Sequence, residues 1–388
     1  MDPTVDRLKF YLLILASLIV SPLFFILIRF KKRAVSGSGL KILIIPQLTR
    51  IGDLVCSTPV FAAIKKTYPQ SRLAVLVSSK AAGILKNNPR IDDLLIYENQ
   101  SLNRLIKKLR REKFDWSFSL SGTALSSLIA FLGIVPNRVK TVRQNRPASE
   151  ILTDWLNNFK LLYRHHAYLP EHHLKLLRFI GIDDLKQEKE IFTGEQSEEK
   201  ARDFFRQNGI SENDFLVGMS VSAGNKAKEW PAENFKKVAR HLIEKRGAKI
   251  IFIGSAADES RINEVSVGLK EGGFFKSFDS DLANLPSLIK RLKLFISVDT
   301  GPVHVAHALK IPLVDIVGPV DPNELVPRGE NIIAVKSGVP PSIFSFKEAG
   351  DPRQQRLALD SIKTEQVEEA VESLIRSAKE SANFKKTE

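Results

Sequence analysis

The chain has 388 residues, 43% hydrophobic and 26% charged, which is typical of globular proteins and long enough for two domains. Its single cysteine, Cys56, excludes an intramolecular disulfide and argues against a cysteine-based metal site. The formal net charge of +14 favours anionic partners such as a lipid surface, phosphorylated glycans or nucleotides. Nucleic acid is not expected, because no stripe of Lys and Arg interleaved with aromatic residues is present.

The N-terminal region contains an apolar stretch, residues 10–28, that carries no charge and is long enough to cross a bilayer as a helix. Basic residues flank it, with the larger number on its C-terminal side at residues 29–33, so the positive-inside rule places the rest of the chain in the cytoplasm. A cleaved signal peptide is disfavoured, because the stretch is too long and no small-residue cleavage site follows it. The sequence therefore predicts a single-pass transmembrane anchor and a short linker, residues 1–39.

From residue 40 onward, short apolar runs alternate with amphipathic stretches. In the first half, strands are predicted at 41–45, 73–77, 94–97 and 115–120, with helices at 54–67 and 102–113. In the second half, strands are predicted at 215–219, 249–253, 293–298 and 312–317, with helices at 232–246, 259–269 and 282–292. Parallel strands covered on both faces by helices give this pattern. We therefore expect two doubly wound α/β domains, residues 40–188 and 189–388, with ligands at the carboxyl ends of the strands.

The first polar motif, Arg50-Ile51-Gly52-Asp53, follows the first predicted strand. Gly52 permits a tight turn, and Asp53 is positioned to cap the helix predicted from Leu54. The functional interpretation is that Asp53 is a general base that removes a proton from an acceptor hydroxyl.

The second motif, Asp299-Thr300-Gly301-Pro302-Val303-His304, follows the strand predicted at 293–298. Pro302 suits the first turn of a helix, whose exposed N–H groups and positive dipole end form an anion site. Thr300 adds a hydroxyl donor, and His304 lies about one turn into the helix. The motif is therefore a candidate pyrophosphate site, with a plain turn as the alternative.

The third motif is Asn225-Lys226-Ala227-Lys228-Glu229-Trp230-Pro231, in a loop before the helix predicted from Ala232. The Lys228 ammonium is positioned to neutralise a diphosphate leaving group, although a lysine in a loop is more often simply solvated. Trp230 is expected to belong to the core.

Together these motifs resemble the ADP-heptose:lipopolysaccharide heptosyltransferase family, glycosyltransferase family nine. The resemblance rests on "ILIIPQLTRIGDLVCSTPVFAAIKKTYPQSRLAVLV", "KEWPAENFKKVARHL", "DTGPVHVAHALKIPLVDIVGPVDP" and "IKTEQVEEAV", and it extends from about Leu40 to Leu374. It implies a GT-B fold, in which two Rossmann-like domains face a central cleft, the first binding the acceptor and the second the nucleotide-sugar. It also implies metal-independent, inverting transfer of a heptose or similar sugar from an ADP-linked donor to a lipopolysaccharide or other cell-envelope glycan. The enzyme would act on the cytoplasmic side of the inner membrane.

Carried over residue by residue, the resemblance makes Asp53 the catalytic base and Lys228 the contact to the leaving phosphate. It assigns nucleotide-sugar binding to Asp299, Thr300, Gly301 and His304, and more loosely to Asp258 and Glu259. Arg50 and Gly52 become candidate acceptor contacts. Residues 138–170 are expected to face the acceptor but differ from the usual family sequence, as does the added N-terminal segment.

Neither a cofactor nor a metal is expected. The four histidines His165, His166, His172 and His173 lack the spacing of a zinc site, so acceptor contact or a solvated loop is the preferred interpretation. Two other functions stay open. A nucleotide-sugar epimerase on the same fold would need no acceptor, and a non-catalytic scaffold of envelope assembly would not need Asp53, Lys228 or Asp299.

Overall fold

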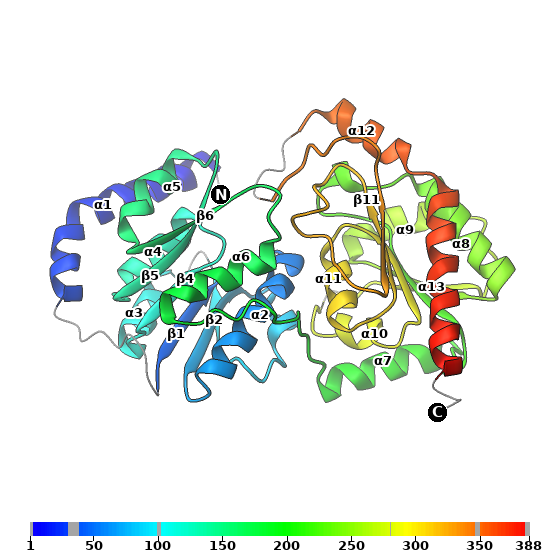
Figure 1. Ribbon diagram of the computed structural model, residues 1–388, viewed down its shortest axis with the longest axis horizontal. Helices are drawn as coiled ribbons and strands as arrows, with labels where there is room; N and C mark the ends of the chain where they lie inside the picture. Colours follow the sequence, from blue (N-terminus) through cyan, green and yellow to red (C-terminus); the bar gives the residue numbers. More distant parts are fainter. Residues whose placement is uncertain (1–2, 30–38, 99–101, 280, 346–349, 385–388) are drawn as a thin grey trace. The chain divides into compact units, whose positions relative to one another are not determined.

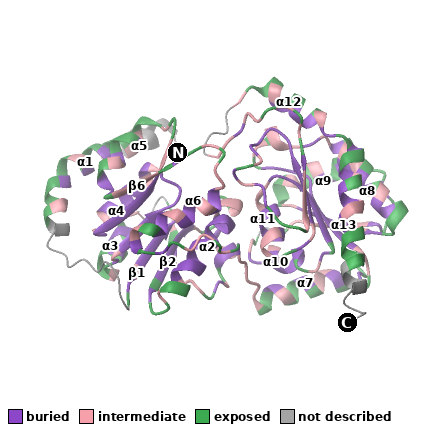
Figure 2. Ribbon diagram, in the orientation of Figure 1, coloured by how far each residue is buried: buried purple, intermediate pink, exposed green. Residues whose placement is uncertain are grey.

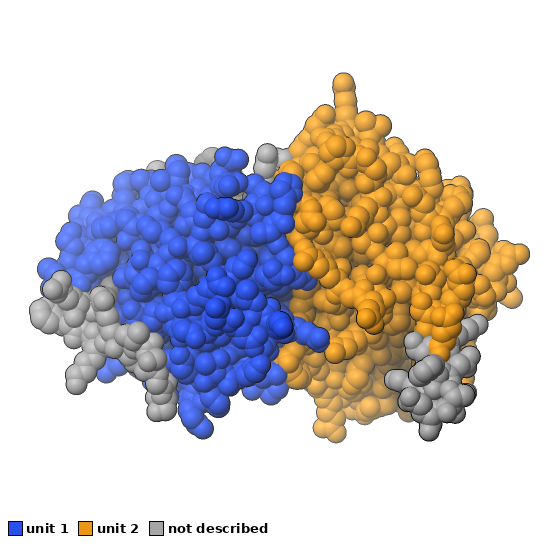
Figure 3. Space-filling model, in the orientation of Figure 1, with its two compact units in different colours: residues 1–82, 88–188 blue, residues 83–87, 189–388 orange. Residues whose placement is uncertain are grey.

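The computed structural model describes residues 3–29, 39–98, 102–279, 281–345 and 350–384 (Figure 1). It divides into two compact units, unit 1 with residues 1–82 and 88–188, and unit 2 with residues 83–87 and 189–388 (Figure 3). Within the described residues, each unit contains a six-stranded parallel sheet. The predicted α/β class with two parallel sheets is confirmed.

The sheet of unit 1 has the strand order β3-β2-β1-β4-β5-β6. Its strands are β1 (Lys41–Ile45), β2 (Arg72–Ser78), β3 (Asp93–Tyr97), β4 (Trp116–Ser119), β5 (Asn137–Arg143) and β6 (Phe159–Tyr163). Its longer helices are α1 (Pro3–Arg29), α2 (Ile51–Thr67), α3 (Leu102–Glu112), α4 (Ala124–Leu132), α5 (Ala148–Thr153) and α6 (Leu169–Lys175). The strand order reverses between β1 and β4, so the loops after these two strands diverge and leave room for a ligand.

The sheet of unit 2 repeats this topology in the order β12-β11-β10-β7-β8-β9. Its strands are β7 (Leu216–Ser220), β8 (Lys249–Ile253), β9 (Phe274–Ser277), β10 (Leu294–Val298), β11 (Leu313–Val317) and β12 (Ile332–Lys336). Its helices are α7 (Glu195–Gln207), α8 (Ala232–Arg246), α9 (Glu259–Ser266), α10 (Leu285–Ile289), α11 (Gly301–Ala308), α12 (Pro352–Ser361) and α13 (Thr364–Phe384). The order reverses between β7 and β10, which carry the loops with Lys228 and Asp299.

Strand β5 is absent from the sequence-based prediction, because two of its residues are charged and yet fully buried. The Arg138 guanidinium donates hydrogen bonds to the carbonyl oxygens of Leu156 (2.5 Å) and Pro136 (3.2 Å). The Lys140 ammonium lies 2.9 Å from Asp154 Oδ1, and burial lowers its pKa. Charged side chains satisfied in this way form a core strand that resembles a surface segment in the sequence.

Helix α1 forms where the apolar N-terminal stretch predicts it and packs along α4 and α5 (Figure 1). Ile14 is buried against a cluster that includes Leu128 and Phe131 of α4, and the rings of Phe24 and Phe131 stack at 5.4 Å. Within the ranges given above, no helix is both long enough and apolar enough to cross a membrane. The prediction of a transmembrane helix is therefore not supported, and one side of α1 is instead used for packing. Residues 36–38 of the predicted linker, which ends at residue 39, and the cations at 31–33 lie outside the described residues.

We predict that Gly122→Ala destabilises unit 1. Gly122 has φ of +66°, and an added Cβ would overlap the carbonyl oxygen of Thr141 on β5. The left-handed backbone alone costs a non-glycine residue about 1–2 kcal/mol, and the overlap adds to this cost. The melting temperature of the variant should fall clearly, whereas Gly338→Ala, with no atom within 4 Å of its Cβ, should melt like the wild type. Equal melting of the two variants would contradict the prediction.

Candidate functional site

The first part of the candidate site is the turn between β10 and α11 in unit 2. Thr300 is the N-cap residue of α11, has extended backbone (φ −139°), and makes no capping hydrogen bond with its side chain. Gly301 and Pro302 form the first helical turn, so the helix begins where the sequence predicts. The start of a helix offers N–H donors and a positive dipole end, which suits a phosphate group.

An ion pair joins this turn to the loop that follows β7. Lys228, at the end of the short helix η5 (Lys226–Lys228), places its Nζ 2.8 Å from Asp299 Oδ2 and 3.3 Å from the Asp299 carbonyl oxygen. The side chain of Asp299 is only 6% exposed and that of Lys228 20%. Strands β7 and β10 are neighbours in the sheet, so their loops bring these two motifs together. Lys228 is therefore held at the start of α11.

Behind the ion pair lies a second carboxyl group, Asp315 on β11, which is fully buried. Neither of its oxygens makes a hydrogen bond within the described part of the chain. Burial, and then the nearby charge of Asp299, raises the pKa of Asp315 well above its ordinary value. Burial in this position therefore favours the protonated form of Asp315.

His304 is 3% exposed, and its Nδ1 lies 3.1 Å from the Nζ of Lys189. Burial, followed by the charges of Lys189, His307 and Lys228, lowers the pKa of His304 well below its ordinary value. A lysine ammonium only donates hydrogen bonds, so Nδ1 of the neutral ring accepts and the ring proton lies on Nε2. Sequence analysis missed Lys189, because it lies in a polar stretch at the predicted boundary between the two domains and belongs to none of the motifs.

Asp258 and Glu259 lie after β8, at the same edge of the sheet. Asp258 Oδ2 accepts hydrogen bonds from the Ser255 backbone N (2.8 Å) and hydroxyl (2.7 Å). Burial opposes ionisation of Asp258, but these bonds and one from the Ser222 hydroxyl lower its pKa overall. Ser222 follows β7, so Asp258 is close to the loop that carries Lys228. Glu259 is exposed.

In unit 1, Asp53 lies in the first turn of α2, and the interpretation of Asp53 as the N-cap residue is wrong. The helix begins at Ile51, with Arg50 as the N-cap residue, so Asp53 is the third residue of the helix. A carboxylate at this position is stabilised by the helix dipole. Asp53 and Gly52 are half-buried, and Arg50 is exposed.

Two further arginines lie close to Arg50. Burial, and then the charges of Arg50 and Arg146, lowers the pKa of Arg143, which is the last residue of β5. Arg143 pairs with Glu150, and the Nη2 atom of Arg146 lies 2.6 Å from Asp154 Oδ2. Sequence analysis assigned residues 138–170 to the acceptor but did not single out these arginines, because β5 was not predicted.

Two of the four paired histidines belong to the core. His172 and His173 on α6 are buried, and burial, with smaller contributions from Lys175 and His172 respectively, lowers their pKa values to about 4 and about 3. His172 Nε2 lies 3.2 Å from Thr141 Oγ1. The solvated-loop interpretation is wrong for these two residues, which belong to the core. Among the described residues, no group of three or more His, Cys, Asp or Glu side chains is placed to hold a metal ion.

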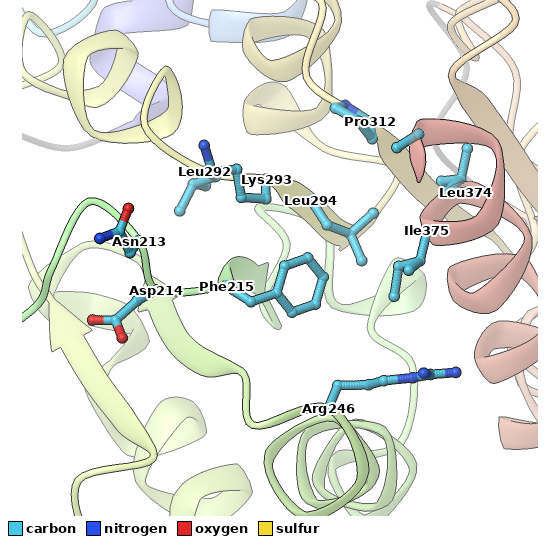
Figure 4. Close-up of a pocket in the computed structure, with 11 residues that line it drawn as sticks. Asn213, Asp214, Phe215, Arg246, Leu292, Lys293, Leu294, Pro312, Leu374 and Ile375 are labelled. Atoms are coloured by element: carbon cyan, nitrogen blue, oxygen red, sulfur yellow. The ribbon is translucent and has the colours of Figure 1, made fainter. Parts of the chain in front are cut away.

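A cavity of about 640 Å³ lies elsewhere in unit 2, and its lining is drawn in Figure 4. Phe215, Leu294 and Pro312 line it at the amino ends of β7, β10 and β11, opposite Leu374 and Ile375 of α13. The candidate site lies at the carboxyl ends of the same strands. The cavity is therefore a separate feature and not the nucleotide site.

Comparisons with known proteins identify the family. Residues 102–348, more than half of the chain, match the family "Glycosyltransferase family 9 (heptosyltransferase)". Lipopolysaccharide heptosyltransferase 3 of Escherichia coli K12 is 26% identical over 299 residues, which cover 74% of this chain and 85% of that protein.

Two solved structures share the GT-B-like fold. A family 9 glycosyl transferase from Veillonella parvula superposes with a TM-score of 0.76 at 21% identity, covering 88% of this chain and 99% of that one. The E. coli ADP-heptose lps heptosyltransferase II superposes with a TM-score of 0.72 at 21% identity, covering 88% of this chain and 100% of that one.

We predict that Asp315→Asn increases the stability of the protein at pH 7 and above. In the unfolded chain Asp315 ionises above its ordinary pKa of 3.8, whereas in the folded chain burial raises that pKa well above this value. Unfolding then releases a proton, so the wild type loses stability as pH rises, by as much as about 1.4 kcal/mol per pH unit from this group. Asn removes that dependence. The variant's gain in melting temperature should grow from pH 5 to pH 8, and a gain that shrinks would contradict the raised pKa.

Proposed function

The chain belongs to glycosyltransferase family 9, and from this we propose that it transfers heptose from ADP-heptose to the lipopolysaccharide core. The observation that carries the donor half of the proposal is the Lys228–Asp299 ion pair at the start of α11. A positive helix end beside a partly buried ammonium group suits a diphosphate better than a neutral ligand. The heptosyltransferase relatives support the sugar and the acceptor.

The donor is proposed to bind in unit 2. The diphosphate accepts hydrogen bonds from the first-turn N–H groups of α11 and from Thr300, with Gly301 allowing close approach. The Lys228 ammonium keeps a hydrogen bond to Asp299 and donates another to the phosphates. Nε2–H of His304 is an additional donor. Asp258, with Glu259 beside it, accepts hydrogen bonds from the ribose hydroxyls, because an ionised carboxylate only accepts hydrogen bonds.

The reaction is proposed to be a single displacement at the anomeric carbon. The Asp53 carboxylate takes the proton of the acceptor hydroxyl, the acceptor oxygen bonds to the anomeric carbon, and the bond from that carbon to the phosphate oxygen breaks. Negative charge then accumulates on the departing ADP, where Lys228 and the start of α11 stabilise it. Attack from the side opposite the leaving group inverts the configuration of the anomeric carbon.

The acceptor is proposed to bind in unit 1. A cationic group at the end of β1 and β5 consists of Arg50, Arg143 and Arg146. Guanidinium groups bind phosphate and carboxylate through bidentate hydrogen bonds. Gly52 leaves space beside Asp53 for an acceptor hydroxyl. The N-terminal segment that includes residues 10–28 is proposed to hold the enzyme at the cytoplasmic face of the inner membrane, where a lipid-linked acceptor is available.

The test of this function is the variant Asp53→Asn. Loss of the general base should lower the rate of heptose transfer by roughly 10²–10⁴. ADP binding should stay unchanged, because the nucleotide site lies in unit 2. Transfer is measured by mass spectrometry of the acceptor glycan after incubation with ADP-heptose.

The matched control is Asp183→Asn, which removes an exposed carboxylate from the same unit. It should transfer heptose at the wild-type rate. Wild-type transfer by folded Asp53→Asn protein would refute the assignment of the base, and absence of transfer by the wild type would refute the proposed substrates.

A further inference from the structure

Over residues 10–26 of helix α1, both serines are buried and seven large apolar residues are exposed. Its buried side carries Ser17 (2% exposed) and Ser21 (0%) together with Ile14. The hydroxyl of Ser21 donates a hydrogen bond to the Leu18 carbonyl oxygen at 2.6 Å, so it is satisfied within the helix. This arrangement is the reverse of a surface helix in water, which presents its polar side to solvent.

Apolar residues are also exposed on neighbouring elements of unit 1. On α1 they are Tyr11, Leu12, Leu15, Ile19, Val20, Leu23 and Ile26; on α5, η3 (Asp154–Leu156) and β6 they are Ile151, Leu152, Trp155 and Leu162. These eleven make up most of the fourteen large exposed hydrophobic residues among those described. The rings of Phe25 and Trp155 lie 5.3 Å apart and join α1 to η3. Figure 2 shows exposed residues along α1 and α5. We call these eleven residues the α1 face.

A basic helix adjoins the α1 face. The guanidinium of Arg110 on α3 lies 5.4 Å from the ring centre of Phe24 on α1. The same helix exposes Lys107, Lys108 and Arg111, while Leu105, Ile106 and Leu109 are buried against the sheet. Apolar residues bordered by exposed cations match the surface of an anionic bilayer, where the cations meet headgroups and the apolar side chains enter the acyl boundary.

We propose that the α1 face docks onto an anionic lipid bilayer, with α1 lying in the plane of the membrane. This deepens the function proposed above and rests on it for the lipid-linked acceptor. The helix keeps its packing on α4 and does not cross the bilayer. A second copy of the chain is the less suitable occupant, because the cations of α3 and the net charge of +14 would repel it.

Tryptophan fluorescence tests the docking directly. Of the three tryptophans, all within the described residues, Trp116 and Trp230 are 2% and 0% exposed, whereas Trp155 is 43% exposed. Adding vesicles of phosphatidylglycerol and phosphatidylcholine to the full chain should shift the emission to shorter wavelength. Lipids brominated on their acyl chains should quench it. If the protein binds the vesicles but the tryptophan emission neither shifts nor is quenched, the proposal would be overturned. That result would mean that α1 attaches to the bilayer without Trp155.

Exposed substitutions test which residues insert. The pair Leu15→Ser and Ile19→Ser should lower the affinity for these vesicles by roughly 100-fold, from the burial lost at two large side chains. The matched control is Val267→Ser with Leu357→Ser, which are exposed on unit 2 (67% and 62%) and should bind like the wild type. Equal binding by both pairs would overturn the proposal.

A charge series completes the test. Replacing Lys107, Lys108 and Arg111 by Gln should lower affinity by about fivefold each on anionic vesicles. The same change at the exposed Lys237, Arg240 and Lys245 of α8 should have no effect. The proposal would be overturned if the wild type dimerises, does not bind vesicles, and loses its dimerisation in the variant with Leu15→Ser and Ile19→Ser. That result would identify a second copy of the chain as the occupant of the α1 face. Because no sugar is present, these results do not depend on transfer activity.

Discussion

The ion pair between Lys228 and Asp299 organises the second unit's site, because a carboxylate removed from water needs a counter-charge beside it. Lys228 supplies that charge to Asp299, whereas burial raises the pKa of Asp315 behind it and so disfavours a second negative charge there. His304, next to Lys189, stays neutral. The ion pair thus holds an ammonium group at the start of α11, where the diphosphate of the donor is proposed to bind.

The parallel sheets explain why such groups gather. In each unit the strand order reverses beside the first strand, so adjacent loops separate at the carboxyl edge of the sheet. In unit 2 these loops hold Lys228 and Asp299; in unit 1 the loop after β1 leads to Arg50 and Asp53. The repeated topology therefore gives each unit a polar group at this edge: a carboxylate with arginines in unit 1, and in unit 2 the ion pair at the proposed diphosphate site.

The regular elements were predictable where apolar runs are uninterrupted, as in β1 and β8, whose bounds match the prediction. The motif around Asp299 was predictable for the same reason, since it directly follows a buried strand. Strand β5 was not, because Arg138 and Lys140 are buried through tertiary contacts that no local pattern records. Lys189 and Arg143 were also missed. Lys189 lies in a polar stretch, and Arg143 is the last residue of β5. The side of α1 that packs on α4 also depends on partners far away in the chain.

The most direct test of the account is calorimetric binding of ADP and AMP to the wild type and to Lys228→Gln. Gln keeps a donor toward Asp299 but removes the charge that the account assigns to the terminal phosphate. The wild type should bind ADP at least about tenfold more tightly than AMP, from one charge-assisted contact of about 1.5–3 kcal/mol. That preference should largely disappear in a folded Lys228→Gln variant. Equal affinity of the wild type for the two nucleotides, or an unchanged preference in the variant, would contradict the account.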